Sequence, residues 1–454
     1  MNKYTLRERD VLLDDSWDVI VAGGGPAGCA AAAAAAREGA KTLLIEATGA
    51  LGGMGTSGLV PAWCPFTDKN RIIYGGMAEQ ILRQCISGMP HVPKECFDWI
   101  PIDAELLKRI YDDLVTQQGV TVLFNTLMTG VECDATGHVD AILVAGKSGL
   151  TAHKAKVYID ATGDADLAAW AGAAYNKGDA KGDLQPATHC FTLTNVDMYA
   201  YQHCGSIKFG ADKDVIDDIV ASGKYPEIPD THACSAIIGP GAIGFNAGHI
   251  WSVDNTNPFS SSKALMQGRK IAKAFRDACA EFFPKAFANA HLTQTASLLG
   301  IRETRRIVGD YVLTLNDYSS RRSFSDEICR NSYFIDIHIA EDEAGSGSHI
   351  TAAASQLVSY KQGESHGIPY RCLTPKGLSN VLVAGRCIST DRSVQGSTRI
   401  MPVCLCTGEA AGIAATMAAR ADIADVHAVD TDTLRRRIRD CGAYLPEIEA
   451  PNKL

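Results

Sequence analysis

Short apolar runs separated by helical segments define the start of the chain. Asp18–Gly24 (DVIVAGG) and Lys41–Glu46 (KTLLIE) are continuous apolar runs of the kind shown by parallel strands buried on both faces. The segment between them opens with GGGPAG and continues as an alanine-rich helix to about Glu38. The pattern therefore predicts a β-α-β unit.

The next part of the chain predicts two helices and a small meander. Gly75–Cys85 and Asp103–Gln118 place apolar residues at helical spacing. Thr121–Gly146 has the pattern of strands with a turn at Ala135–Gly137, which is consistent with an antiparallel meander. Lys156–Asp160 (KVYID) is a further short apolar strand.

The middle of the chain differs from both ends. From about Gly172 to Arg371 strands, helices and polar loops are mixed without the βα alternation. A buried strand returns at Asn380–Gly385, and Pro402–Arg420 predicts a long helix of small residues. We therefore expect an α/β domain formed by residues 1–171 and 372–454, with a mixed α+β domain of residues 172–371 inserted in it.

Composition and charge narrow the class of protein. Hydrophobic residues make up 46% and charged residues 21%, which is typical of a globular chain. A net charge of −9 argues against a nucleic-acid binder and against a basic membrane-surface protein. The 15 cysteines are scattered and contain no CxxC pair, so we expect no metal site and no iron–sulfur cluster.

The sequence features that direct proteins to membranes or to secretion indicate the expected cellular compartment. The first residues of the chain alternate charges without an apolar core, so no signal peptide is expected. No apolar stretch reaches the roughly 18 residues of a membrane span. Unpatterned cysteines in a large chain favour a reducing compartment. We therefore expect a soluble, cytoplasmic protein without a membrane or nucleic-acid partner.

A glycine motif follows the first strand and opens the first helix. Gly23 permits a tight turn, Gly25 lets the backbone approach a pyrophosphate, and Gly28 lets the helix pack on the sheet. Glu46 ends the next strand, where a carboxylate accepts hydrogen bonds from ribose hydroxyls and disfavours a 2′-phosphate. This arrangement predicts a dinucleotide site.

The segments that follow favour a flavin over a nicotinamide. Leu51–Thr56 (LGGMGT) comes next, where an NAD enzyme would continue with further βα units. Ile159–Asp166 (IDATGDAD) and Asn380–Ser389 (NVLVAGRCIS) supply strands whose carboxyl ends lie near the same crevice. Gly239–Gly248 is glycine-rich, but it lacks a long preceding strand and an acidic follower, so we predict a loop there.

These segments resemble the FAD-dependent oxidoreductases of the glutathione-reductase/fumarate-reductase superfamily. More closely, they resemble a bacterial FAD-dependent oxidoreductase family related to the flavin subunit of heterodisulfide reductase. The resemblance spans nearly the whole chain and is carried by DVIVAGGGPAGCAAA, LGGMGTSGLV, YGGMAEQIL, IDATGDAD, LGIRETRRIVGDYVLT, FIDIHI, IPYRCLTPKGLSNVLVAGRCIS and GSTRIMPVCLCTGEAAGIAA. It implies a Rossmann-like FAD-binding domain, a non-covalent FAD and an inserted substrate domain, with the flavin between them.

The resemblance and the motifs together predict the residues that hold FAD. They are Gly23, Gly25, Pro26, Ala27, Gly28, Glu46, Ala47, Gly52, Gly53, Met54, Gly55, Thr56, Ala161, Thr162, Gly163, Asp164, Gly385, Arg386, Arg399, Ile400 and Met401. Many relatives have Gly-Asp where this chain has Gly385-Arg386, so only a backbone contact is carried over there, with Arg386 as a candidate. The cluster cysteines of heterodisulfide-reductase flavin subunits are also absent, which disfavours a multi-cluster complex.

The helix near Pro402 has an expected electrostatic role. A helix N-terminus carries about half a positive charge. If this end faces the flavin pyrimidine, it stabilises the negative charge that develops at N1 and O2 on reduction. The alternative is a packing helix, since Gly408, Ala410, Ala411 and Gly412 allow close approach to the first helix.

Two segments offer candidates for substrate chemistry. Gly300–Gly309 (GIRETRRIVG) places Arg302 and Arg305 at i, i+3 spacing, either in an ion-pair network or as ligands of an anionic or hydroxylated substrate. Tyr333–Ile339 alternates as a strand, with Asp336 and His338 on one face. A carboxylate next to an imidazole orients a general base, or forms a structural pair.

Other polar residues are expected to be structural. His189 and His249 are lone histidines, and Cys64 is a small apolar filler without a resolving partner. Cys404 and Cys406 point to different helix faces, so they do not form a redox pair.

The sequence thus predicts an FAD-dependent oxidoreductase that transfers hydride between a small organic substrate and flavin N5. The substrate and the electron acceptor or donor stay open, as does assembly into a homo-oligomer. Three alternatives are a flavoprotein electron carrier with a partner protein, a non-oxidative flavin-dependent lyase or isomerase, and an NAD-only dehydrogenase.

Overall fold

The main sheet combines parallel and antiparallel strands. The structure, a computed structural model, describes residues 4, 7–8, 10–205, 207, 214–341, 351, 354, 357 and 359–447. The strand order is β3-β2-β1-β6-β5-β4, and β15 also pairs with β6. The strands are β1 (Leu12–Ala22), β2 (Thr42–Ile45), β3 (Thr121–Leu123), β4 (Leu127–Cys133), β5 (Val139–Gly146), β6 (Gly149–Asp160) and β15 (Val381–Val383).

Strand β6 belongs to both halves of this sheet. It pairs in parallel with β1, where Val21 lies opposite Ile159, and with β15, where Leu382 lies opposite Ile159. It pairs antiparallel with β5, which in turn pairs antiparallel with β4. The predicted α/β class, a Rossmann-like parallel sheet with an antiparallel meander, is therefore confirmed.

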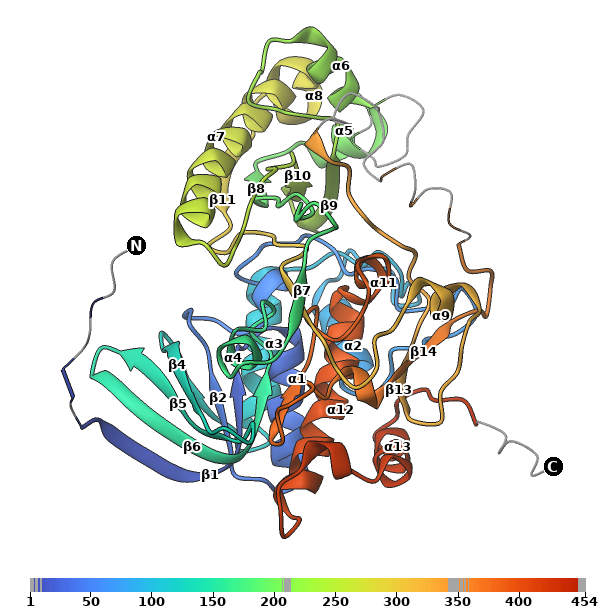
Figure 1. Cartoon of the computed structure of the whole chain (residues 1–454). Coiled ribbons are helices and arrows are strands. Elements are labelled where there is room, and N and C mark those ends of the chain that lie inside the picture. The colour runs from blue at the N-terminus through green and yellow to red at the C-terminus, as the bar shows by residue number, and fades with distance from the viewer. Residues whose placement is uncertain are drawn as a thin grey trace.

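Two helices of small residues pack against each other beside the sheet. They are α1 (Pro26–Arg37) and α12 (Met401–Ala419), which lie side by side in Figure 1. A Cβ atom on Gly408 would lie 2.1 Å from the Ala27 carbonyl oxygen, and one on Gly412 would lie 2.2 Å from that of Ala31. The small residues therefore set the separation of the two helices.

Helix α12 is long and apolar because it is a core helix. Among the described helices it is the one with the length and composition to cross a membrane, but 94% of that window is buried inside the protein. The predicted helices α2 (Met77–Gly88) and α3 (Ala104–Thr116) also form. The side chain of Asp103 caps α3 by accepting hydrogen bonds from the backbone N–H groups of Glu105 and Leu106.

A second lobe lies above the sheet in Figure 1. Its antiparallel sheet has the order β11-β8-β10-β9. The strands are β8 (Phe191–Thr194), β9 (Ala233–Gly239), β10 (Ala242–Ala247) and β11 (His291–Thr295), and the helices are α5 (Met198–His203), α6 (Val215–Ser222), α7 (Pro258–Phe282) and α8 (Pro284–Phe287). Phe191 stacks on Phe245 at 5.0 Å between ring centroids, inside this lobe's own apolar core.

The loop predicted for Gly239–Gly248 is wrong. Residues Ala242–Ala247 form β10, which pairs with β9 and places Ile243 opposite Ile237. Gly241 supplies the positive φ of +67° that the tight turn of this hairpin requires. The glycines marked a turn between two short strands, not a continuous loop.

The remaining elements are short. The strands are β7 (Tyr175–Lys177), β12 (Arg305–Ile307), β13 (Glu327–Asn331) and β14 (His366–Pro369). The helices are α4 (Asp166–Trp170), α9 (Leu315–Ser319), α11 (Arg392–Thr398) and α13 (Thr431–Asp440), and the 3₁₀ turns are η1 (Gly53–Gly55), η3 (Tyr370–Cys372) and η4 (Val426–Ala428).

Two sequence predictions fail in this region. The helical spacing assumed for Gly300–Gly309 is wrong, because Arg305 and Arg306 lie in the extended strand β12, which pairs with β7. The strand predicted for Tyr333–Ile339 is also wrong, since β13 ends at Asn331 and the residues after it are irregular. The alternation instead reflects an extended segment with Ile335 and Ile337 buried in the main core.

The described residues form two large apolar cores. One includes β1, α1, β6 and α12 and also takes in residues from Ile307 to Tyr370. The other is formed by residues from Ala187 to Ile301. The division of the chain at residues 171/172 and 371/372 stays a prediction.

Candidate functional site

A cavity of about 720 Å³ lies at the carboxyl ends of the parallel strands. Gly23 and Gly25 line it after β1, Glu46 after β2, Ala161–Asp164 after β6, and Ala384–Arg386 after β15. Residues of the second lobe, including Thr188 and His232, also line it. This is where open α/β sheets bind their ligands.

The glycines of the first loop have two different roles. Gly23 and Gly28 are required by the packing of the fold, whereas Gly25 faces the cavity. A Cβ on Gly28 would lie 1.7 Å from the Gly23 carbonyl oxygen, and one on Gly23 would lie 2.6 Å from that of Ala161. Nothing lies within 4 Å of a Cβ built on Gly25, which lines the cavity. Gly25 is also the N-cap of α1 and makes no side-chain capping hydrogen bond. This open, uncapped helix end fits a pyrophosphate.

Glu46 is held rigidly at the rim of the cavity. Its Oε2 accepts a hydrogen bond from the Gly24 N–H at 2.7 Å, and its Oε1 accepts one from the Thr48 N–H at 2.7 Å. The side chain is buried and lines the cavity with Ala47. Each carboxylate oxygen has a second lone pair, so Glu46 can also accept hydrogen bonds from the ribose hydroxyls of a dinucleotide.

The second glycine segment contributes to the cavity only in part. Gly53 and Met54 line the cavity. Gly52 has a φ of +97° and packs against the ring of Tyr111, and the Thr56 hydroxyl donates a hydrogen bond to the Leu51 carbonyl. The other predicted ligands of this segment, Gly52, Gly55 and Thr56, do not line the cavity. Gly52 and Thr56 instead fix the conformation of the loop.

The N-terminus of α12 faces the same cavity. Arg399, Ile400 and Met401 line it, and the N-cap Ile400 makes no side-chain capping hydrogen bond. The Arg399 guanidinium donates a hydrogen bond to the Asp336 carboxylate at 2.9 Å. The positive end of the helix dipole and a guanidinium thus lie on one wall.

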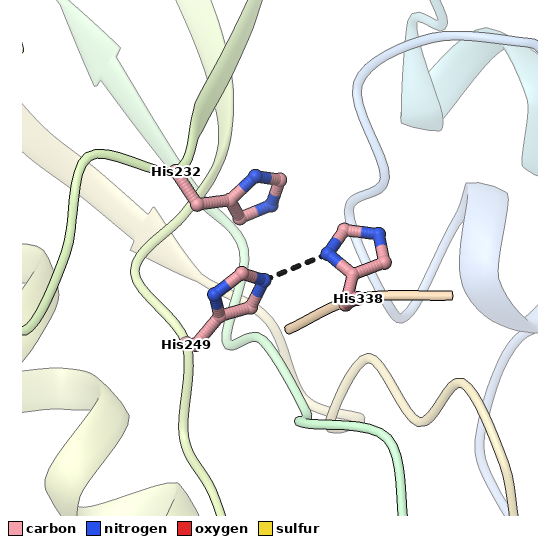
Figure 2. Close-up of side chains that lie close together, drawn as sticks. All are labelled: His232, His249 and His338. Atoms are coloured by element: carbon pink, nitrogen blue, oxygen red, sulfur yellow. Dashed lines mark hydrogen bonds between the residues drawn. The ribbon is translucent and has the colours of Figure 1, made fainter. Parts of the chain in front are cut away.

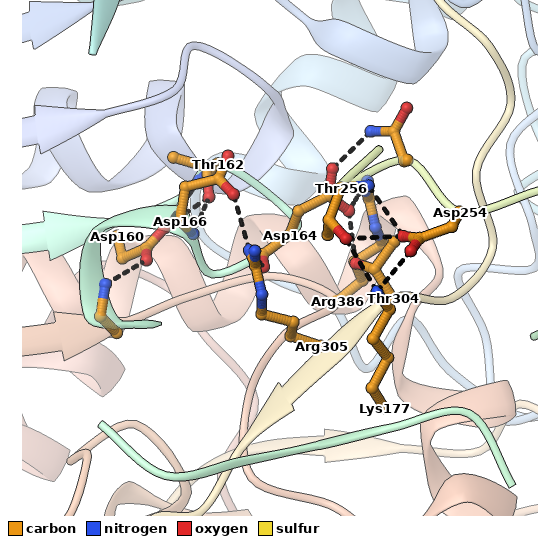
Figure 3. A network of polar contacts seen from close by, with 12 residues as sticks. Asp160, Thr162, Asp164, Asp166, Lys177, Asp254, Thr256, Thr304, Arg305 and Arg386 are labelled. Carbon is orange, nitrogen blue, oxygen red and sulfur yellow. Dashed lines mark hydrogen bonds and ion pairs between the residues drawn. The ribbon is translucent and has the colours of Figure 1, made fainter. Parts of the chain in front are cut away.

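Asp164 joins the end of β6 to the inserted lobe (Figure 3). Its carboxylate accepts hydrogen bonds from Arg386 at 2.6 Å, from Asn255 at 2.5 Å and from the Thr304 hydroxyl. Burial opposes ionisation, but the Arg386 charge and these hydrogen bonds lower the pKa of Asp164 below its usual range. Arg386 therefore lines the cavity as half of an ion pair, and not as an isolated cation.

The arginines predicted for substrate chemistry are separated by the fold. Arg305 pairs with Asp166 at 2.7 Å (Figure 3). Arg305 lies over the Tyr175 ring and does not line the cavity, although Asp166 does. Arg302 lines the cavity, and its Nη1 donates hydrogen bonds to the Pro186 carbonyl and the Thr188 hydroxyl, both at 2.8 Å. Burial, with the nearby Arg399 charge, lowers the pKa of Arg302 to about 10.

Three buried imidazoles, those of His232, His249 and His338, converge at the cavity wall (Figure 2). Arg302 contacts His232. The Nε2 atom of His249 lies 2.7 Å from Nδ1 of His338. The rings of His232 and His249 stack at 4.3 Å with an interplanar angle of 1°. His249, expected to be a lone structural histidine, is therefore part of a cluster, and sequence reasoning missed His232. No motif signals this cluster, because its members come from separate segments.

The predicted Asp336–His338 pair does come together. The Asp336 Oδ1 atom lies 3.4 Å from the His338 Nε2 atom, and both residues line the cavity. Burial opposes ionisation of Asp336, but His338 and the Arg399 charge lower its pKa well below the usual range. Burial and the Arg302 charge lower the pKa of His338. The carboxylate is therefore ionised and the imidazole neutral at pH 7.

The three imidazoles are spaced closely enough for a metal ion, with ligand atoms within 4.8 Å of one another. However, the Arg302 guanidinium lies 3.3 Å from the His232 Nε2 atom and places a positive charge there. His249 and His338 also use facing nitrogens in a hydrogen bond to each other. We therefore assign these residues to hydrogen bonding and not to metal binding.

The cysteines at the cavity are thiols. Cys64, Cys190, Cys234 and Cys404 line it. Burial raises the pKa of each of these thiols to about 12. Within the described residues all cysteines are free, so none of them forms a disulfide.

Residues 18–438 match the protein family described as FAD dependent oxidoreductase. Comparison with curated protein sequences gives no significant match. Solved structures similar to the chain include a geranylgeranyl bacteriochlorophyll reductase-like protein from Thermoplasma acidophilum, with 14% identity, coverage of 96% of this chain and 93% of that chain, and a TM-score of 0.46. Another is p-nitrophenol 4-monooxygenase PnpA from Pseudomonas putida DLL-E4, with 10% identity, coverage of 95% and 85%, and a TM-score of 0.43.

Proposed function

The chain belongs to the FAD-dependent oxidoreductase family, and from this premise we propose that it transfers hydride between a small organic substrate and flavin N5, with His338 moving the accompanying proton. The observation that carries the proposal is a neutral imidazole next to an ionised carboxylate, on the wall of a cavity that fits FAD. Such an imidazole accepts a proton at neutral pH.

Different parts of the cavity would bind different parts of FAD. The uncapped N-terminus of α1 with Gly25 would hold the pyrophosphate, and Glu46 the ribose of the adenosine. When bound, FAD supplies the two-electron acceptor or donor. The N-terminus of α12 and Arg399 would favour negative charge on their wall of the cavity.

The second lobe would place the substrate. His338 and Asp336 lie on the cavity wall with Arg302, whose charge favours an anionic or hydroxylated substrate. The lobe's residues, including Thr188 and Cys190, cover the same cavity and would exclude water from it. Hydride would leave one substrate atom while His338 takes the proton from its neighbour.

The partners and location belong to the same proposal. We propose a freely diffusing small-molecule substrate, a separate electron acceptor or donor, and a cytoplasmic location. On the segments quoted above, we also propose a relationship to the flavin subunit of heterodisulfide reductase without its clusters. The electron-carrier alternative requires a partner protein to reduce the flavin, and the lyase or isomerase alternative requires turnover without a net acceptor.

The test is anaerobic screening of small organic acids and alcohols for bleaching of the bound flavin. Purified protein should carry FAD or acquire its absorbance when FAD is added. With a bleaching substrate, we expect His338→Ala to slow flavin reduction by about 10²-fold or more while FAD stays bound. Unchanged reduction by His338→Ala would remove this residue from the mechanism, and protein that never binds FAD would contradict the whole proposal.

A further inference from the structure

We propose that Asp230 and His249 position His338 and share its proton, so that a proton taken up at the cavity passes one ring further into the protein. The inference rests on the proposed function, in which His338 is the acid–base group. It adds two positioning residues that lie behind the cavity wall.

The four side chains form a continuous buried chain. Asp230 accepts a hydrogen bond from His249 Nδ1, and His249 Nε2 lies 2.7 Å from His338 Nδ1. His338 Nε2 then faces Asp336 Oδ1 at 3.4 Å. The exposed fractions are 2% for Asp230, 0% for His249, 6% for His338 and 8% for Asp336. Bulk water therefore cannot replace these hydrogen bonds.

The hydrogen-bond partners assign the tautomers of the two rings. We take Asp230 as a carboxylate, which only accepts hydrogen bonds and so places the proton of His249 on Nδ1. The Nε2 atom of neutral His249 then accepts a hydrogen bond from Nδ1–H of His338. Consequently the lone pair of neutral His338 is on Nε2. The distance of 3.4 Å from Nε2 to Asp336 Oδ1 exceeds that of a typical hydrogen bond.

This tautomer state permits a balanced transfer. The substrate gives a proton to His338 Nε2, and the proton on His338 Nδ1 moves to His249 Nε2. The pair gains one proton in total, and no electron is transferred within it. The positive charge ends on His249, beside the Asp230 carboxylate, and His338 is again neutral with its proton on Nε2.

The surrounding charges favour this direction. Arg302 and the ionised Asp336, which is paired with Arg399, face the His338 ring. Asp230 faces His249, and His232 stacks on it. Burial and the Arg302 charge lower the pKa of His338, against the opposing effect of the Asp336 carboxylate. At His249 the Asp230 carboxylate favours the charged ring. Together these effects favour the positive charge on His249 over His338.

The experiment is a pH titration of the FAD-loaded full chain labelled with ¹⁵N-histidine, followed by NMR. We expect a low-field proton signal from His249 Nδ1, and the two rings should take up one proton in a single shared step. In Asp230→Asn the signal should disappear and the midpoint of the step should fall by about one pH unit or more, since the carboxylate favours the charged ring. The His249→Gln variant assigns the signals and should leave His338 titrating alone.

A matched control exists elsewhere in the chain. Asp310 accepts a hydrogen bond from His427 Nδ1 at 2.6 Å, outside the cavity, so Asp310→Asn removes a similar contact and should not change the step. Two rings that titrate independently, or a midpoint unchanged in Asp230→Asn, would overturn the inference. A divalent metal present in equimolar amount, whose removal by a chelator changes both ring signals, would overturn it as well.

The same variants separate this inference from the proposed function. If His338→Ala slows flavin reduction but Asp230→Asn and His249→Gln keep the wild-type pH profile of kcat, the relay fails and the function stands. If His338→Ala reduces flavin at the wild-type rate, the function fails, and the NMR titration alone decides whether the rings share a proton. Should Asp230→Asn not fold, the wild-type titration still decides the question.

Discussion

Gly25 and Gly28 lie three residues apart on the same turn, but they face different constraints. Gly28 has no room for a side chain, because its Cβ would lie 1.7 Å from the Gly23 carbonyl oxygen. Gly25 has room within the protein and an ordinary backbone conformation, with φ of −72° and ψ of −174°. The absence of a side chain at Gly25 therefore leaves space for the ligand, and the fold does not require it.

This contrast gives a matched pair of variants. Gly25→Ala should leave the unfolding free energy of the apo protein unchanged or raise it by about 0.4–1 kcal/mol. It should weaken FAD binding by about tenfold or more, because the methyl group faces the cavity. Gly28→Ala should lower the unfolding free energy by about 1–3 kcal/mol through overpacking. Urea unfolding and fluorescence titration with FAD measure both effects, and equal FAD affinity in Gly25→Ala and wild type would contradict this placement.

Asp160, at the end of β6, carries a pH dependence of stability. Burial raises its pKa to about 6, against an opposing effect of the hydrogen bonds from Ala168 and Thr162. Its unfolded value is about 3.9. The folded state therefore holds a proton more tightly, and its stabilisation is complete below about pH 4 and lost as the pH rises through 6.

We expect the Asp160 carboxyl to reduce the unfolding free energy by about 2 kcal/mol between pH 4 and pH 7. Asp160→Asn does not titrate, so its stability relative to wild type should rise by that amount over the same interval. Urea unfolding of both proteins at several pH values measures the difference. A constant difference across the interval would show that Asp160 ionises normally.

Some side-chain contacts could be predicted from the sequence because they are local. Asp336 and His338 lie two residues apart in an extended segment, so the alternation brought them together although no regular strand forms. His232 and His249 approach His338 only because the β9–β10 hairpin lies over the cavity. The sequence contains no periodicity that relates these positions.

At the scale of elements, α1 and α12 depend on each other. Gly408 and Gly412 lie against the backbone of α1, and the N-terminus of α12 forms a wall of the cavity. Movement of α12 would therefore displace Arg399 and Ile400 as well. The packing of two helices and the geometry of the cofactor site are coupled.

Gly408→Ala tests this coupling. The added methyl group would lie 2.1 Å from the Ala27 carbonyl oxygen, so we expect a loss of about 1–3 kcal/mol in unfolding free energy despite the better helix propensity of alanine. FAD affinity should fall too, although Gly408 does not line the cavity. Ser262→Ala on the exposed side of α7 is the control. Thermal unfolding and FAD titration distinguish the outcomes, and unchanged affinity would refute the coupling.

The elements with a clear apolar period were predictable. The β-α-β unit, α2, α3 and the meander follow from buried runs and helical spacing, and all form. Gly300–Gly309 was misread because the spacing of its charged residues suits a helix, whereas pairing with β7 makes it extended. Tertiary pairing overrides local preference in such short polar segments.

At the scale of the whole molecule, two apolar cores enclose one cavity. Residues after Ile301 return to the first core, and β15 completes the main sheet next to β6. The order of segments along the chain indicated an interrupted α/β domain, because buried strands occur at both ends. Sequence patterns could not supply the orientation of the lobes, since it depends on contacts such as Asn255–Asp164 between distant segments.

The position of β15 beside β6 has a consequence during synthesis on the ribosome. The second core ends at Ile301, so its residues leave the ribosome well before β15 and α12 do. Until then the alanine face of α1 lacks its partner, and β6 lacks one neighbour. Domains generally fold as units during translation, and exposed apolar surface at that stage promotes aggregation. The nascent chain therefore carries α1 without its α12 partner for most of its elongation.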